Sequence, residues 1–375
     1  MVENVSSRSG STLSSKKEFI NGFLSIGEPC SPLRHEKWVS MRNRGLAAFA
    51  KAHWNTLLRR TNRGIPQEFR WESWKVALKF DHYLPIVSSD YEELACKTNE
   101  YSTLIQIDVP RTFPELKIFD DEIQQQLSRI LVAYSNYHPE IGYCQGMNFV
   151  AGLLLLVSGF DELETYVGFV GLMNELGLAD FYMPTFPLIQ KYIQAFDTIT
   201  QKMWPGLHRH FQKEEISAAV FLHQWFLTMF VVILPLRTVV TLWDYILFTG
   251  LSSVMSVSFG LLHLLMPQMR QLKFEGIMGL LKHIKDTDLK DDIRVGRIIV
   301  NQAYRIALNH GSFDPFIMSQ EDASTNAPPK LDSVRSASAP MENFVQRDMP
   351  SIPTNRDTKS KFDDPSHKGT VRPDA

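Results

Sequence analysis

Cysteine is scarce in this chain of 375 residues. The three that occur, Cys30, Cys96 and Cys144, are widely spaced and odd in number, which argues against a disulfide framework and for a reducing compartment. The motifs C-x-x-C, H-E-x-x-H and G-x-S-x-G are absent, so zinc sites, metalloproteases and esterases are disfavoured. The phosphate-binding motif G-x-x-x-x-G-K-[ST] is absent too. We therefore expect that this chain does not itself hold a nucleotide.

The sequence also lacks a strong charge bias and an uninterrupted apolar run. Its net charge of -2 gives no reason to expect a nucleic-acid partner. The N-terminus has no apolar run of the signal-peptide kind. The most apolar stretch, residues 218–236, contains His223, Gln224 and Pro235, so we expect a buried helix there rather than a membrane span. These absences favour a cytoplasmic protein with at most peripheral membrane association.

What the sequence does contain is helical periodicity along most of its length. With 44% hydrophobic residues it can bury one large core or two smaller ones. Apolar side chains recur at helical spacing after Asp120, and polar residues occupy the other face. We expect helices near residues 35–60, 67–79, 89–98, 120–137, 145–157, 162–177, 187–203, 216–230, 236–248, 253–268, 274–285 and 292–309. This pattern predicts an all-α fold of two packed helical halves.

The two ends differ from the middle of the chain. Residues 1–33 are expected to be a flexible N-terminal segment, and residues 34–60 a basic helical lead-in. Over residues 1–60 there are ten Lys or Arg against four Asp or Glu, which favours a solvated helix face, with attraction to an anionic membrane as the alternative. Residues 319–375 are rich in Ser, Pro, Asp and Lys, so we expect them to be disordered.

One arginine and one glutamine lie in two short motifs, I-Q-I-D-V-P-R-T-F-P at residues 105–114 and G-Y-C-Q-G-M-N at residues 142–148. Hydrolysis of a nucleoside triphosphate needs positive charge on the transferring oxygens and a group that aligns the attacking water. Arg111 can supply the charge, and the Gln145 amide can hold the water. Taken singly, Arg111 is better explained by a salt bridge to Asp108, and Gln145 by a helix start in a Gly-flanked turn.

Together, the two motifs resemble those of the TBC domain of Rab GTPase-activating proteins. A third signature of that family, R-x-x-x-W, is present as Arg70 and Trp74, just after the opening Gly-Ile-Pro at residues 64–66. A further family-like stretch contains Trp225, Phe226, Leu227, Phe230, Leu234, Pro235, Trp243 and Asp244. The similarity covers about residues 60–310.

The resemblance implies an all-α TBC domain of two packed helical subdomains at residues 61–310, with flexible N- and C-terminal extensions. It implies an activator that accelerates GTP hydrolysis by a Rab-family small GTPase and regulates vesicle trafficking, rather than a stand-alone enzyme. By the same resemblance, Arg111 is the arginine finger and Gln145 the glutamine finger, both supplied in trans. GTP and Mg²⁺ are expected to be carried by the partner, with no cofactor or metal bound by this chain. Recruitment to endomembranes is expected on the same basis.

Six further residues are expected to support the two fingers: Asp108, Thr112, Tyr143, Gly146, Arg70 and Trp74. Asp108 is expected to orient Arg111 or the Gln145 loop. Tyr143 is expected to pack inward and hold that loop, and the Gly146 backbone to permit its tight turn. Arg70 and Trp74 lie four residues apart on one helix face, where support of the core is the preferred interpretation and a role beside the partner the alternative.

Three alternatives stay open at this point. The same helical surface can bind a Rab or an adaptor without catalysis, as a scaffold. Cys144 and His138 are close enough in sequence to suggest a thiol nucleophile, an interpretation we disfavour. In the tail, residues 335–340 resemble a 14-3-3 docking motif in which Ser338 is the phosphosite. The sequence does not name the Rab, the membrane or the oligomeric state.

Overall fold

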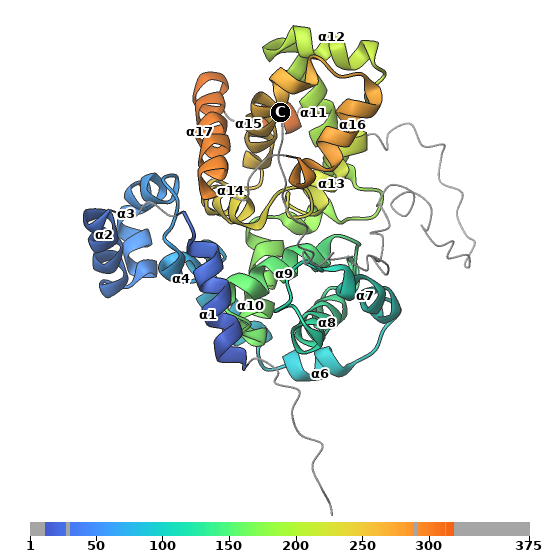
Figure 1. Ribbon diagram of the computed structural model, residues 1–375. Coiled ribbons are helices and arrows are strands. Elements are labelled where there is room, and N and C mark those ends of the chain that lie inside the picture. Colours follow the sequence, from blue (N-terminus) through green and yellow to red (C-terminus); the bar gives the residue numbers. More distant parts are fainter. Residues whose placement is uncertain (1–11, 28–30, 288–291, 312, 319–375) are drawn as a thin grey trace, which may run out of the picture. The chain divides into compact units, whose positions relative to one another are not determined.

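The computed structural model describes residues 12–27, 31–287, 292–311 and 313–318. Regular structure in these residues is helical, without a β-strand (Figure 1). The first helices of the chain are α1 (Leu13–Ser25), α2 (Pro32–Asn43), α3 (Leu46–Thr61), α4 (Gln67–Ala77), α5 (Phe80–Val87), α6 (Tyr91–Cys96), α7 (Ser102–Asp108), the 3-10 turn η1 (Val109–Arg111), α8 (Asp121–Tyr137), α9 (Met147–Ser158), α10 (Glu162–Glu175) and the 3-10 turn η2 (Leu178–Phe181). The later ones are α11 (Pro187–Met203), α12 (Pro205–Lys213), α13 (Ala219–Leu227), α14 (Leu236–Thr249), α15 (Ser253–Met269), α16 (Phe274–Lys282), the 3-10 turn η3 (Ile284–Asp286), α17 (Ile293–His310) and α18 (Asp314–Met318).

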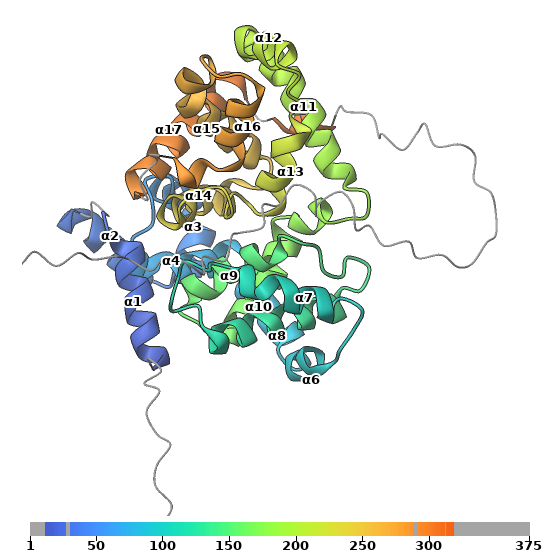
Figure 2. The same cartoon turned by 45° about the vertical axis from the view of Figure 1, so that its right-hand side comes forward.

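The helices form two groups that follow one another along the chain. Figures 1 and 2 show α6 to α10 gathered in one group and α11 to α17 in the other, with α13 and α14 on the side that faces the first group. The expectation of an all-α fold of two packed helical halves is therefore confirmed.

Two helices of the first group show how the sequence directs this packing. In α8, the Asp120 side chain accepts a hydrogen bond from the Ile123 amide and caps the helix, and the apolar residues at helical spacing are buried. In α9, eleven of twelve residues are buried, so this helix is apolar on all sides and lies inside the domain. The Gln145 segment directly precedes α9 and is therefore attached to one of the best-packed parts of the fold.

A buried ion pair connects α4 to α14. Arg70 Nε lies 3.1 Å from Asp244 Oδ1, and the Trp74 indole donates to the same oxygen at 2.9 Å. The Ile65 amide donates to Asp244 Oδ2 at 2.9 Å. Burial raises the pKa of Asp244, and the nearby Arg70 guanidinium and these hydrogen bonds oppose that rise. Arg70 and Trp74 thus support the core between two distant parts of the sequence.

The expectation of a flexible segment at residues 1–33 is wrong for residues 13–25, which form helix α1. Ile20 and Leu24 are fully buried on the inner face of α1, and Lys16 reaches Asp120 and Glu122, each at 2.7 Å. The carboxylates that fix this helix lie more than one hundred residues further along the chain. Residues 1–11 and the tail at residues 319–375, including Ser338, lie outside the described residues.

The expected single helix at residues 35–60 is two helices. Gly45, with φ of 78°, separates α2 from α3, and α3 is itself kinked at His53. An L-residue with a side chain rarely adopts the conformation of Gly45, so this glycine ends the helical path. The lead-in at residues 34–60 is therefore helical, as expected, but it folds as a pair of helices.

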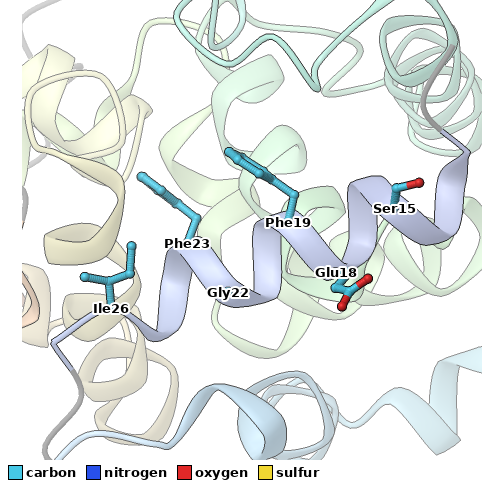
Figure 3. A pocket seen from close by; sticks show the side chains of 6 residues that line it. All are labelled: Ser15, Glu18, Phe19, Gly22, Phe23 and Ile26. Carbon is cyan, nitrogen blue, oxygen red and sulfur yellow. The ribbon is translucent and has the colours of Figure 1, made fainter. Parts of the chain in front are cut away.

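The outer face of α1 carries apolar side chains, of which Phe19 and Ile26 are exposed and Phe23 is half-buried. Figure 3 shows Phe19, Phe23 and Ile26 pointing to one side of this helix. They border a hollow of about 470 Å³ lined by Ser15, Glu18, Phe19, Gly22, Phe23 and Ile26. Neither Arg111 nor Gln145 lines this hollow. Within the described part of the chain, no helix is both long enough and apolar enough to cross a membrane.

Candidate functional site

Arg111 lies at the end of a short helix, where its side chain projects outward. Helix α7 ends at Asp108, and residues 109–111 continue it as one 3-10 turn, closed by a hydrogen bond from the Thr112 amide to the Val109 carbonyl at 3.0 Å. Pro110 has no amide hydrogen to continue an α-helix, which favours the change to a 3-10 turn. Val109 is buried, whereas the Arg111 side chain is 62% exposed. The turn thus anchors Val109 in the core and presents Arg111 at the surface.

The Asp108 carboxylate orients the guanidinium of Arg111 through an ion pair. Its Oδ1 lies 3.5 Å from Arg111 Nη1, and its Oδ2 accepts a hydrogen bond from the Tyr143 hydroxyl at 3.0 Å. The Asp108 pKa is raised by burial, an effect that the Tyr143 hydrogen bond and the Arg111 charge oppose. The ion pair considered above as the ordinary explanation of Arg111 is therefore present. Because most of the Arg111 side chain stays exposed, this pair positions the side chain without burying it.

The Gln145 loop depends on two glycines with positive φ. Gly142 has φ of 62°, and a Cβ atom there would lie 2.1 Å from the Tyr101 ring. Gly146 has φ of 109°, and its Cβ would lie 3.0 Å from the Leu227 carbonyl oxygen. Only glycine satisfies both the backbone angle and the close contact at Gly142. Gln145, between the two, is half-buried and lies two residues before the start of α9.

Asn148 connects the two motifs, and it is absent from the site residues expected from the sequence. Its Nδ2 donates to Thr112 Oγ1 at 2.9 Å and approaches the Asp108 carbonyl at 3.4 Å. Its Oδ1 accepts from the Gly146 amide at 3.2 Å and lies 3.4 Å from the Tyr143 hydroxyl. Asn148 is only 1% exposed, so these contacts are made inside the protein. It ends the G-Y-C-Q-G-M-N run, which is the signal that points to it.

The structure thus brings together four of the six supporting residues expected from the sequence. Asp108, Thr112, Tyr143 and Gly146 share one hydrogen-bond network through Asn148. Arg70 and Trp74 instead bind Asp244, in the ion pair between α4 and α14. The network joins the segment that carries Arg111 to the segment that carries Gln145. We call it the Asn148 network.

The interpretation of Cys144 as a thiol nucleophile finds no support in its surroundings. Burial raises the pKa of the Cys144 thiol to about 12, with the Asp108 charge as a smaller cause, so the thiol stays protonated at neutral pH. His138 Nδ1 lies 2.9 Å from a Glu140 carboxylate oxygen. A protonated, partly buried thiol is a poor nucleophile.

Comparison with known proteins places this geometry in a family. The model of the Rab-GTPase-TBC domain matches residues 67–270, a range that contains both motifs and the Asn148 network. The chain is 31% identical over 218 residues to the Rab GTPase-activating protein eat-17 of Caenorhabditis elegans, which covers 58% of this chain and 24% of that protein. It is 30% identical over 251 residues to the human ecotropic viral integration site 5 protein homolog, covering 66% of this chain and 30% of that one. The chain thus spans less than a third of each of these relatives.

Solved structures share the fold at low sequence identity. The TBC domain of the Chlamydomonas flagellar RabGAP superposes with a TM-score of 0.60 at 17% identity, covering 81% of this chain and 99% of that one. The Ypt/Rab-GAP domain of Gyp1p superposes with a TM-score of 0.59 at 16% identity, covering 80% and 99%. At this level of identity the likeness establishes the fold alone.

Proposed function

The chain belongs to the Rab-GTPase-TBC domain family, and from this premise we propose that it accelerates GTP hydrolysis by a Rab-family small GTPase. Two observations support the proposal. One relative that matches this chain is named as a Rab GTPase-activating protein and another as a GTPase-activating protein. The observation that carries it is the Asn148 network, which joins the exposed Arg111 to the Gln145 loop through Asp108 and Tyr143.

In this mechanism Arg111 and Gln145 complete the active site of the partner. The Arg111 guanidinium places positive charge on the oxygens of the transferring phosphoryl group, and the Gln145 amide orients the attacking water. Asp108 holds the guanidinium in position through the 3.5 Å ion pair. GTP and Mg²⁺ are brought by the GTPase, so this chain acts as an activator and has no turnover of its own.

The competing proposal is a scaffold that binds a Rab or an adaptor without catalysis. A scaffold has no need of an exposed arginine held by a buried carboxylate, nor of a glutamine loop tied to the same network. Burying the Asp108 carboxylate is costly, as its raised pKa indicates. The placement of that carboxylate beside an exposed arginine favours the catalytic proposal.

Single-turnover GTP hydrolysis over a panel of GTP-loaded Rabs tests the proposal. On the Rab that the wild type accelerates, we expect Arg111→Lys to lose most of the stimulation, about 10³-fold or more, since an ammonium cannot bridge two phosphate oxygens as a guanidinium does. Gln145→Ala is expected to lose about 10²- to 10³-fold while still binding the Rab. Full stimulation by either variant would contradict its role.

A matched control is available on α17. Arg294 is an exposed arginine that also pairs with an aspartate, Asp292, at 3.3 Å. Arg294→Lys makes the same chemical change at a site that belongs to neither motif. It is expected to stimulate hydrolysis as the wild type does, which separates a specific role of Arg111 from a general effect of replacing a surface arginine.

Two finer proposals concern where the protein acts. We propose peripheral recruitment to the endomembranes that carry the partner Rab, with the basic residues of α2 and α3 as one source of attraction to anionic lipid.

We also propose that phosphorylated Ser338 binds a 14-3-3 protein. That residue lies outside the described part of the chain, and mass spectrometry that finds Ser338 unmodified in cells would remove this proposal.

A further inference from the structure

Helix α7 leads directly into the Arg111 turn and has two contrasting faces. Ile105 and Asp108 are buried, whereas Leu104 and Ile107 are 37% and 48% exposed. Leu104 and Ile107 are three residues apart, so their side chains are neighbours on the helix surface. Arg111 follows four residues after Ile107. An exposed apolar pair, Leu104 and Ile107, here called the α7 stripe, therefore precedes the proposed arginine finger on the same helix and its 3-10 continuation.

Helix α7 itself carries no exposed charged side chain. Between Glu100 and Asp108 the sequence has no acidic or basic residue, and the Asp108 carboxylate is buried beside Arg111 and Tyr143. A surface for nucleic acid or for an anionic membrane carries lysine or arginine, and α7 has neither. Interfaces between proteins, by contrast, are depleted of charge at their centre. The α7 stripe thus fits a protein partner with an apolar patch.

We propose that the α7 stripe is a docking surface for the GTPase, in contact with an apolar patch beside the bound nucleotide. The inference rests on the function proposed above. A phosphate that reaches Arg111 brings the surface around the nucleotide site close to the residues that precede Arg111 in α7. Leu104 and Ile107 then determine how tightly the GTPase binds, whereas Arg111 and Gln145 determine how fast the bound complex reacts.

This division of roles predicts opposite kinetic effects. Leu104→Ser and Ile107→Ser remove exposed apolar groups and leave the buried face of α7 intact, so both variants are expected to fold. In hydrolysis measured against increasing concentrations of the activator, the double variant is expected to raise KM about tenfold, with kcat within about twofold of the wild type. Arg111→Ala is expected to show the reverse pattern, a lower kcat with a similar KM.

The control is a leucine elsewhere that is even more exposed. Leu308 on α17 is 65% exposed, and Figures 1 and 2 show α17 well apart from α7. Leu308→Ser is expected to leave both constants unchanged. The inference is overturned if the α7 double variant keeps the wild-type KM, or if its only effect is a lower kcat. It is also overturned if light scattering shows a wild-type dimer that the double variant dissociates, because the stripe then binds a second copy.

Failure of the proposed function gives a different result. If the wild type accelerates no Rab in the panel, the docking role of the α7 stripe is tested by measuring direct binding to Rabs loaded with a non-hydrolysable GTP analogue. Binding by the wild type that weakens about tenfold in the double variant supports docking without catalysis. Binding that the double variant leaves unchanged, or no binding to any Rab, overturns the inference.

Discussion

At the scale of single residues, one carboxamide joins the two segments on which the proposed chemistry depends. Asn148 donates to Thr112 on one segment and accepts from the Gly146 amide on the other. Both its donor and its acceptor are used, and its side chain is buried. A buried amide of this kind favours one arrangement of its neighbours, because a shift of either segment leaves a polar group without a partner.

Replacing the Thr112 hydroxyl tests this role of Asn148. Thr112→Val keeps the shape of the side chain and removes the hydroxyl that accepts from Asn148. We expect kcat for stimulated hydrolysis to fall about tenfold, with little change in KM, since one buried hydrogen bond that fixes the Arg111 segment is lost. Single-turnover assays at saturating activator measure this effect. Thr112→Ser keeps the hydroxyl and should retain activity; equal activity of the two variants would remove the positioning role.

The sequence predicts the identities of the site residues better than their connections. Arg111 and Gln145 follow from two motifs because each motif specifies a residue type at a fixed position. Asn148 stands in the second motif, but its contacts depend on the positive φ of Gly146 and on the path of α9, which are properties of the folded chain. For the same reason, the role of Arg70 becomes specific only when folding places Asp244 beside it.

At the scale of elements, α1 is the main departure from the sequence prediction. On its inner face, Lys16, Ile20 and Leu24 recur every four residues. Because the first of the three is charged, the sequence alone does not mark this face as buried. Burial lowers the pKa of Lys16, but the hydrogen bonds and charges of Asp120 and Glu122 outweigh this effect and raise it overall. A lysine that is buried and paired in this way anchors α1 to the start of α8.

Reversing this charge is expected to detach α1. Lys16→Glu places a third carboxylate against Asp120 and Glu122, so we expect amide hydrogen exchange in α1 to become at least about tenfold faster, while α9 and α14 keep their protection. Lys17→Glu, at the neighbouring exposed position, makes the same charge change and is expected to leave exchange in α1 unaltered. Slow exchange in both variants would show that the ion pairs do not hold the helix.

Helix length and capping make some of the other elements easier to predict from the sequence than others. Helix α8 has seventeen residues and an aspartate cap, so its period and its start are both visible in the sequence. Helix α7 has seven residues, which is less than two full periods of the helical pattern, and it was not predicted. The division of residues 35–60 into α2 and α3 depends on Gly45, whose positive φ is not evident from the sequence alone.

At the scale of the whole molecule, the ion pair of Arg70 and Asp244 joins α4 to α14 across about 170 residues of sequence. Both side chains are almost completely buried. Removing only one partner leaves a buried charge without compensation, which is among the more destabilising changes in a protein interior. The pair therefore concerns the stability of the fold rather than the chemistry proposed for Arg111 and Gln145.

Arg70→Ala is expected to lower the free energy of unfolding by about 3–5 kcal/mol, because it leaves the Asp244 carboxylate unpaired. Thermal or urea unfolding of the purified chain measures this loss. The double variant Arg70→Met, Asp244→Asn removes both charges and is expected to recover part of the stability. A single variant as stable as the wild type would contradict this account of the core.

Helix α7 contacts the Gln145 loop at both of its ends. At its start, the Tyr101 ring packs against Gly142, and at its end the Asp108 carboxylate accepts from Tyr143. A displacement of this short helix would therefore move Arg111 and the Gln145 loop together. On the proposal that the GTPase docks on α7, Arg111 and the Gln145 loop are held relative to each other before it binds, so little conformational searching is left for the encounter complex.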